Sequence, residues 1–271
     1  MALAHWLKDQ VDISREEVNL ADEVANSRPA PLREFDQIYM RAGDLLLQTK
    51  LIAPLLSGTT VAFVGDGDCM SLMLGIFGSK GLADPPQRMI VLDFDERILG
   101  NADRFASRHG FSGSLDSRLY NIQEPLPNDL AGVADWFYTN PPYGSENRGR
   151  SCIQFIDRCI DVAKPEGSLG CVIMPYDHYR PWTIDGMQAV QSYLLAHGYV
   201  ISNSLQQFHA YHLEDNPDLL SSVLLVDRTE FVSGDYHGRP IPLEELVTLY
   251  GSPRRIPRYV RASGQIDYEW P

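Results

Sequence analysis

The chain has 271 residues, of which 23 are Lys or Arg and 36 are Asp or Glu, so its formal net charge is −13. Its 44% hydrophobic share, with 21 Gly and 18 Pro, is typical of a globular protein and excludes disordered, collagen-like and coiled-coil chains. No window approaches about 18 uninterrupted apolar residues, so we expect a soluble, cytoplasmic protein without a membrane span. The negative charge disfavours nucleic acid as a partner and favours cationic small molecules.

Residues 1–55 are predicted to form a helical region. Ser14 and Glu17 have the spacing of a capping box, and the apolar run over residues 45–52 indicates a second helix. Prolines between the two helices begin an extended segment. We expect the helices, together with Trp6, to form a lid over the site described below.

Residues 56–230 alternate between short apolar strands and helical stretches. Such alternation is typical of βαβ units and predicts an α/β fold with a Rossmann-like, mostly parallel sheet. The last two strands, at 200–207 and 222–226, are separated by a polar loop, which predicts an antiparallel hairpin at the sheet edge. Earlier strands are expected at 60–64, 89–92, 118–121, 134–138 and 168–174, with a helix at 151–162.

Residues 231–271 are predicted to be a C-terminal extension with a basic cluster. The cluster consists of Arg254, Arg255, Arg258 and Arg261. It is either a local nucleic-acid footprint or, as we expect, a group of side chains that dock against the acidic body or remain solvated.

The cysteines and histidines give no strong site signal. Cys69, Cys152, Cys159 and Cys171 form no Cys-x-x-Cys pair, so we expect buried core thiols. His209 and His212 are three residues apart in an apparent strand-to-loop segment, where they would not share a face. We therefore predict no metal site.

The first predicted strand runs into the turn Gly65-Asp66-Gly67-Asp68, where open α/β sheets bind nucleotides. A dinucleotide fingerprint would require glycine where Met70 stands, and the two carboxylates would repel a pyrophosphate. S-adenosylmethionine suits the turn better, because its sulfonium and ammonium groups are positive and the glycines let the backbone approach its amino acid moiety. A purely structural turn is the alternative.

The second predicted strand ends at Asp93, the position from which an acidic residue accepts hydrogen bonds from a ribose diol. A helix cap is the alternative role for Asp93. Phe94 is placed to lie on the adenine face, and Asp95 is predicted to cap the next helix. Asn121, at the end of the third predicted strand, is placed to reach the adenine edge.

The fourth predicted strand is followed by Asn140-Pro141-Pro142-Tyr143. The two prolines rigidify the turn, hold the Asn140 carboxamide and a backbone carbonyl as acceptors, and present Tyr143 as an aromatic wall. Such a group can orient an amine toward the electrophilic carbon beside a sulfonium, while an aromatic ring stabilises the positive charge. The pattern predicts nitrogen alkylation, with Asn140 and Tyr143 as catalytic residues and Asn140 and Pro141 also contacting the donor.

Two further catalytic candidates, Tyr176 and Asp177, follow the fifth predicted strand. They are placed to bind the sulfonium or to take the proton of the amine. Aromatic packing beside a solvated Asp is the alternative interpretation.

Together these motifs resemble the class I S-adenosylmethionine-dependent fold and, more narrowly, the branched-chain polyamine synthase family, the N4-bis(aminopropyl)spermidine synthases. The resemblance runs from residue 35 to about residue 226 and includes the glycine turn, residues 91–97 and 124–127, and the turn at Asn140. It implies transfer of an aminopropyl group from decarboxylated S-adenosylmethionine to a polyamine nitrogen, with release of methylthioadenosine. It also implies that Asp36 and Gln37 touch the donor; pinning of the extended segment is an equal alternative.

The chain departs from that family at two positions. Gly67 and Asn140 stand where the family usually has acidic residues, and we also expect the family's amino-terminal winged-helix portion to be lacking. Each change removes negative charge, which favours the intact donor and disfavours a polyamine acceptor. The chain is also similar to azetidine-2-carboxylate synthases, in which the donor's own amine closes a four-membered ring.

The sequence therefore predicts an enzyme that alkylates an amine with S-adenosylmethionine and releases methylthioadenosine, most specifically by cyclisation to azetidine-2-carboxylate. Such a site should be dry and aromatic, because the amine must compete with water. N-methyl transfer to an amino group and aminopropyl transfer to a polyamine are the alternatives. A non-enzymatic binding protein ranks last, because it would need no rigid amine-orienting turn. Self-association into an oligomer is compatible with the sequence.

Overall fold

The computed structural model of the chain describes residues 8, 10–211, 219–250 and 255–269. Trp6, His212 and Arg254, which carried expectations above, lie outside these residues. Among the described helices, none is long and apolar enough to cross a membrane.

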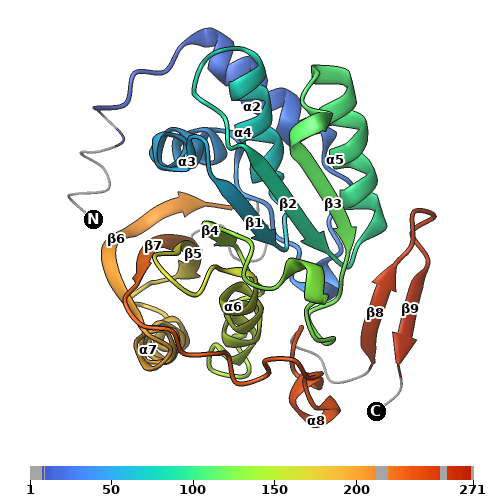
Figure 1. Cartoon of the computed structure of the whole chain (residues 1–271), viewed down its shortest axis with the longest axis vertical. Helices are drawn as coiled ribbons and strands as arrows, with labels where there is room; N and C mark the ends of the chain where they lie inside the picture. Colours follow the sequence, from blue (N-terminus) through green and yellow to red (C-terminus); the bar gives the residue numbers. More distant parts are fainter. Residues whose placement is uncertain (1–7, 9, 212–218, 251–254, 270–271) are drawn as a thin grey trace.

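A seven-stranded sheet in the order β3-β2-β1-β4-β5-β7-β6 forms the centre of the fold (Figure 1). The first five strands of this order are parallel, whereas β7 runs antiparallel to both β5 and β6. This arrangement confirms the predicted mostly parallel sheet with an antiparallel edge hairpin. The strands are β1 Thr60–Val64, β2 Arg88–Asp93, β3 Leu115–Leu119, β4 Trp136–Thr139, β5 Leu169–Pro175, β6 Tyr199–Ala210 and β7 Leu220–Arg228.

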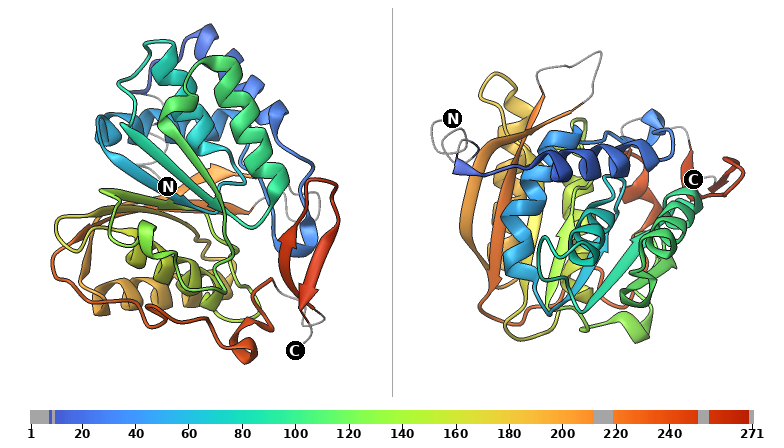
Figure 2. Two further views of the ribbon diagram at one scale, coloured as in Figure 1. Left: turned by 45° about the vertical axis from the view of Figure 1, so that its right-hand side comes forward. Right: turned by 90° about the horizontal axis from the view of Figure 1, so that it is seen from above.

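Helices cover both faces of the sheet (Figure 2). One face carries α2 Arg15–Ser27, α3 Ala42–Leu56, α4 Met70–Ser79 and α5 Glu96–His109, and the other carries α6 Arg150–Val162 and α7 Pro181–Ala196. Short helical turns are η1 Arg33–Phe35, η2 Ser112–Ser114, η3 Asn128–Leu130 and α8 Leu243–Leu246. The predicted helical face of α6 is buried in the core, and all four cysteines are buried and free.

The N-terminal helices belong to the helical layer. Helix α2 begins with the predicted capping box, in which Ser14 Oγ accepts from Glu17 N at 3.2 Å and Glu17 Oε2 accepts from Ser14 N at 2.6 Å. Apolar residues of α2 and α3 belong to the same hydrophobic core as the sheet. The two helices pack against each other and against α4, and α3 also packs against β6. Among the described residues, neither α2 nor α3 lines the cavity described below, whereas residues 35–39 between them do, so only this segment has the place expected of a lid.

The C-terminal extension is held to the body by a buried arginine. Arg158 on α6 has no exposed surface, and its guanidinium donates to the carbonyls of Ile122, Tyr236 and Arg239 at 2.8–2.9 Å. One guanidinium thus ties the segment after β3 and the extension to the same helix.

Strands β8 Ile256–Val260 and β9 Ile266–Glu269 form a separate antiparallel hairpin at the end of the extension (Figure 1). Arg261 pairs with Glu96 of α5 at 2.7 Å, and Arg258 pairs with Glu124. These pairs confirm, for Arg258 and Arg261, that the basic cluster docks against the acidic body.

Candidate active site

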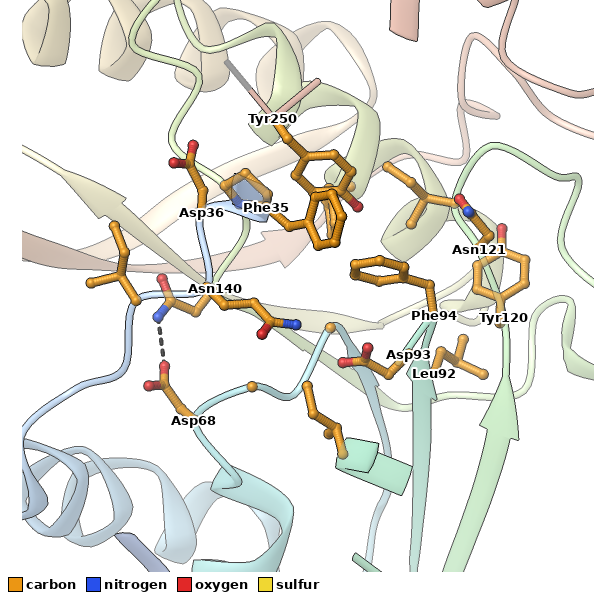
Figure 3. A pocket seen from close by; sticks show the side chains of 18 of the residues that line it. Phe35, Asp36, Asp68, Leu92, Asp93, Phe94, Tyr120, Asn121, Asn140 and Tyr250 are labelled. Atoms are coloured by element: carbon orange, nitrogen blue, oxygen red, sulfur yellow. Dashed lines mark hydrogen bonds between the residues drawn. The ribbon is translucent and has the colours of Figure 1, made fainter. Parts of the chain in front are cut away.

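A cavity opens at the carboxyl ends of β1, β2 and β4 (Figure 3), the edge at which parallel α/β sheets bind ligands. The empty space within it, which is continuous with open solvent, is about 630 Å³. Among the described residues that line it, three are acidic, namely Asp36, Asp68 and Asp93, and none is Lys or Arg. The negative character expected from the net charge is therefore concentrated at this site.

The turn after β1 requires glycine at two positions. Gly65 has φ +75°, a conformation that side chains rarely adopt, and a Cβ there would lie 3.2 Å from the Phe155 ring. A Cβ on Gly67 would lie 3.1 Å from the ring of Tyr39. Both glycines line the cavity, so the backbone is open to a ligand here.

The two carboxylates of this turn have different roles. Asp66 accepts hydrogen bonds from the backbone N of Met70 at 2.8 Å and from Ser71, so it caps the first turn of α4. Asp66 does not line the cavity, contrary to the expected donor contact, because its carboxylate is turned toward the helix. Burial raises the pKa of Asp66 to about 7.

Asp68 lines the cavity and is held from two sides. Its carboxylate accepts from Met40 N at 2.7 Å and from Asn140 Nδ2 at 2.6 Å. Its backbone carbonyl accepts two hydrogen bonds from the Arg28 guanidinium. Burial raises the pKa of Asp68, and the nearby Arg28 charge opposes that rise. Asp68 thus couples the turn after β1 to the turn after β4.

Asp93 lies at the end of β2 and lines the cavity, as predicted. Its two carboxylate oxygens accept from Asp66 N and Asp95 N, each at 3.0 Å. Burial, with a contribution from the Asp95 carboxylate, raises the pKa of Asp93 to about 7. The predicted cap role falls to Asp95, whose side chain accepts from Arg97 N at 2.9 Å.

Three aromatic rings form one wall of the cavity. Phe94 stacks on Tyr250 with centroids 5.7 Å apart and an interplanar angle of 26°, and Phe35 meets both rings edge-on at 5.7 and 5.4 Å (Figure 3). Only Phe94 was expected from the sequence. A planar heteroaromatic group matches this wall, because offset-stacked and edge-to-face contacts are the favoured aromatic geometries.

The turn after β4 places the Asn140 carboxamide in the cavity. Asn140 Nδ2 donates to Asp68 (Figure 3). Asn140 Oδ1 can accept from the Tyr143 hydroxyl at 3.2 Å. Pro142 lines the cavity, whereas Pro141 and Tyr143 are buried and are not among its lining residues. Tyr143 therefore lies behind the turn and is not the aromatic wall that was expected.

Asp36 and Gln37, in the segment before α3, both line the cavity. Gln37 also pins this segment, since it accepts from Leu32 N at 2.8 Å and donates to Asp95 at 3.1 Å. Burial raises the pKa of Asp36, with the Arg33 charge opposing that rise. Gln37 therefore pins the segment, and contact of Asp36 and Gln37 with the donor stays a prediction.

Asn121 lines the cavity, but its polar atoms are engaged elsewhere. Its amide nitrogen donates to the carbonyls of Pro257 and Arg258 in β8, and its oxygen accepts from Gln123 N. The expected contact with an adenine edge is thus replaced by an anchor for the C-terminal hairpin.

Tyr176 and Asp177 do not line the cavity. The Asp177 carboxylate accepts from Tyr179 N at 2.9 Å and pairs with Arg180. The Tyr176 ring lies 5.1 Å from that of His178. Both residues follow β5, which is one strand farther from the cavity than β4. Asp177 instead forms an ion pair with Arg180, just before the start of α7.

Among the described residues, no cluster of three His, Cys, Asp or Glu side chains is arranged to hold a metal ion. His209 has hydrogen-bond partners on both ring nitrogens, Ser221 Oγ at 3.0 Å and Gln48 Oε1 at 2.9 Å. It is therefore part of the buried polar structure.

Comparison with known proteins places this geometry in a family. Residues 16–230 match the family described as the branched-chain polyamine synthase A C-terminal domain. The chain belongs to this family. The match includes every strand of the seven-stranded sheet and ends before the C-terminal extension.

Curated relatives of this polyamine synthase family cover a longer protein. The N(4)-bis(aminopropyl)spermidine synthase of Thermococcus kodakarensis is 26% identical over 205 residues, which are 74% of this chain and 54% of the relative. The enzyme of the same name from Thermus thermophilus is 28% identical over 192 residues, 69% of this chain and 51% of the relative. The chain thus spans about half the length of the curated relatives it matches.

Solved structures agree with the fold. The branched-chain polyamine synthase of Thermus thermophilus, solved in complex with N4-aminopropylspermidine and 5′-methylthioadenosine, has a TM-score of 0.70 at 22% identity, covering 83% of this chain and 67% of that one. A candidate RNA methyltransferase of Pyrococcus horikoshii has a TM-score of 0.59 at 13% identity, covering 81% and 100%. These likenesses confirm the class I methyltransferase-like fold.

Three aromatic residues at the cavity were not assigned to the site from the sequence. Phe35 and Tyr250 come from segments outside the sheet, and Tyr39 packs on the glycine turn. The hydroxyl of Tyr39 is buried without a hydrogen-bond partner. Residues at the ends of the strands could be predicted because parallel strands bring their carboxyl ends to one edge of the sheet. No sequence pattern of this kind predicts that these three rings lie at the cavity.

Proposed function

We propose that the cavity binds an S-adenosylmethionine-type donor and transfers its three-carbon chain to an amine, releasing methylthioadenosine. The observation that carries this proposal is the Asn140 carboxamide, which is fixed by Asp68 in the same cavity as Asp93 and the aromatic wall. The Thermus thermophilus relative, which was solved in complex with 5′-methylthioadenosine, adds support.

The donor is oriented by the two ends of the cavity. Its adenine lies against Phe94 and Tyr250, and its ribose hydroxyls donate to Asp93. The sulfonium then lies toward the glycine turn and Asn140, in a lining that contains carboxylates and no basic side chain. This arrangement places the electrophilic carbon chain beside the Asn140 carboxamide.

The reaction forms one carbon–nitrogen bond and breaks one carbon–sulfur bond. The amine first releases a proton to solvent, and its lone pair attacks the side-chain carbon attached to the sulfonium. The bonding pair leaves with sulfur, which becomes the neutral thioether of methylthioadenosine. Asn140 Oδ1 accepts an N–H of the amine and thereby directs its lone pair to this carbon.

The most specific form of the proposal takes the donor's own amine as nucleophile and yields azetidine-2-carboxylate. Two features support it: the carboxamide of Asn140 is neutral, and Asp68 already accepts from Met40 and Asn140. Neither group is then a free anionic contact for the several ammonium groups of a polyamine. Aminopropyl transfer to a polyamine is the second candidate, favoured by the family to which the chain belongs.

Mass spectrometry of three reactions distinguishes these acceptors. The pure protein is incubated with S-adenosylmethionine carrying a ¹⁵N-labelled amine, with the same donor plus spermidine, and with decarboxylated donor plus spermidine. The proposal predicts equal amounts of methylthioadenosine and ¹⁵N-azetidine-2-carboxylate from the donor alone. The Asn140→Ala variant is the control for spontaneous breakdown of the donor.

Product that forms only when spermidine is present, and carries an added aminopropyl group, would replace cyclisation by the second candidate. Adenosylhomocysteine formed with an added acceptor would contradict both, because it requires transfer of the methyl group.

A further inference from the structure

A chain of buried hydrogen bonds leads away from the Asn140 turn into the protein. The Tyr143 hydroxyl contacts the hydroxyl of Tyr211, which lies 2.7 Å from Ser221 Oγ. Ser221 in turn lies opposite His209 in the β6–β7 register, and His209 reaches Gln48 on α3. We call these five side chains the buried relay: Tyr143, Tyr211, Ser221, His209 and Gln48.

The relay is closed to solvent. Tyr143 is 7% exposed, Tyr211 is 1% exposed, and the other three members have no exposed surface. Each polar atom in it must therefore find its partner within the protein, because a buried group without one is costly. Each hydroxyl has a single proton, so the direction in which one member donates decides the direction of the next.

The direction is set at the Gln48 end. The amide nitrogen of Gln48 lies 3.3 Å from Cys171 Sγ, which leaves Gln48 Oε1 as an acceptor facing His209 Nε2. His209 must then carry its proton on Nε2. Burial, together with the charge of Lys8, lowers the pKa of His209 to about 3, so the ring is neutral and Nδ1 is an acceptor.

The remaining directions follow one by one. Ser221 donates to His209 Nδ1, so Ser221 Oγ must accept from Tyr211. Tyr211 has then used its proton, and its oxygen accepts from Tyr143. The Tyr143 proton is therefore directed to Tyr211, although Asn140 Oδ1 also lies within 3.2 Å of the Tyr143 oxygen.

Asn140 is fixed from its other side as well. Its amide nitrogen donates to the Asp68 carboxylate, so the oxygen cannot exchange places with it (Figure 3). The Tyr143 hydroxyl can donate to Asn140 Oδ1 or to Tyr211, and when the relay directs its proton to Tyr211, Asn140 Oδ1 and the Tyr143 oxygen both offer lone pairs to each other. A ligand with N–H donors, such as an amine, can hydrogen-bond to these two acceptor oxygens, whereas a ligand without N–H or O–H donors cannot.

We propose that the buried relay holds the Tyr143 proton away from Asn140 and so keeps the Asn140 carbonyl oxygen open for an N–H of the reacting amine. The inference rests on the proposed function for the identity of that amine, and it assigns Tyr143, Tyr211, Ser221 and His209 as positioning residues. No proton travels along the relay. Its effect is to fix which atoms are acceptors before the amine arrives.

Replacing Tyr211 tests this assignment. Tyr211→Phe removes the acceptor of the Tyr143 proton, which then turns to Asn140 Oδ1 and competes with the amine. We expect kcat to fall about tenfold or more, while the Kd for methylthioadenosine, measured by calorimetry, stays within about twofold. Tyr143→Phe removes the competing proton altogether, so its kcat should fall less than that of Tyr211→Phe.

The matched control is Tyr199→Phe. Tyr199 lies on the same strand β6, has no exposed surface, and contacts a serine hydroxyl, Ser168 Oγ, at 3.2 Å. It is outside the relay, so its kcat should match that of the unaltered protein. A loss in Tyr143→Phe equal to or larger than that in Tyr211→Phe would overturn the proposal. Ser221→Ala, which removes the acceptor of Tyr211, gives the same test if Tyr211→Phe fails to fold.

The tautomer of His209 gives a test that does not depend on turnover. In ¹⁵N-histidine-labelled protein without donor, the His209 signals are identified by their loss in His209→Gln. The relay predicts a protonated Nε2, an unprotonated Nδ1 and no titration between pH 5.5 and 8. A proton on Nδ1 would contradict the relay direction, whereas an inactive protein with the predicted tautomer would contradict only the proposed function.

Discussion

The two ends of the cavity are built in different ways. The polar end, formed by Gly67, Asp68 and Asn140, consists of residues that directly follow parallel strands and are fixed by short hydrogen bonds. The aromatic end, formed by Phe35, Phe94 and Tyr250, joins a strand end to two segments outside the sheet. The polar end is therefore suited to orienting reacting atoms, and the aromatic end to binding a flat group.

If this division is correct, substitutions at the polar end should change kcat, and substitutions at the aromatic end, or at Asp93 next to Phe94, should change affinity. Four predictions follow this division, beginning with the largest expected effect.

Asn140→Ala should lower kcat by about 100-fold or more, because it removes the acceptor that directs the amine. The Kd for methylthioadenosine should change by less than about threefold, since this thioether has no amine. Steady-state kinetics and calorimetry measure the two effects. Asn128→Ala, on the exposed turn η3, is the matched control. An affinity loss as large as the loss in kcat would place Asn140 among the binding residues.

Asp93→Asn should weaken methylthioadenosine binding by about tenfold or more, because hydrogen bonds to a charged acceptor contribute about 1.5–3 kcal/mol each. At saturating donor, kcat should change much less. Asp103→Asn, a substitution at a partly exposed helix position, is the control. Unchanged affinity in Asp93→Asn would exclude Asp93 as the ribose acceptor.

Tyr250→Leu should weaken the same binding by about tenfold, which corresponds to the loss of one stacked ring at about 1–3 kcal/mol per base. The kcat at saturation should remain near that of the unaltered protein. Phe231→Leu is a suitable control, because Phe231 lies in the same extension but is 58% exposed and packs on Arg228. A drop in kcat without a change in Kd would place Tyr250 at the reacting end.

The pH dependence of binding should show the smallest effect. With a pKa of about 7, Asp93 is mostly protonated at pH 6 and mostly ionised at pH 8. Only the ionised form offers both oxygens as acceptors to a ribose diol, so affinity should rise with pH, by somewhat less than tenfold over this interval. The profile of Asp93→Asn should be flat. Affinity that falls as pH rises would contradict the assignment.

The same division explains what could be predicted from the sequence. Asp68, Asp93 and Asn140 were identified because residues that follow parallel strands meet at one edge of the sheet. Phe35 and Tyr250 were missed because their place depends on how distant segments pack, and neither lies in a periodic pattern or beside a strand.

Asp66 shows a second limit of sequence reasoning. Asp66 and Asp68 are two residues apart, yet one carboxylate caps α4 and the other faces the cavity. The left-handed conformations of Gly65 and Cys69, at φ 75° and 58°, decide the direction of each side chain. Asn121 and Arg158 show the same limit, because their partners in the C-terminal extension are more than 70 residues away.

The nucleoside product is the most direct test of the account, because it reports which bond to sulfur is broken. After incubation of the pure protein with S-adenosylmethionine, chromatography with mass detection should show methylthioadenosine that accumulates in proportion to protein and is nearly absent with Asn140→Ala. Adenosylhomocysteine as the protein-dependent nucleoside would show methyl transfer and contradict the account.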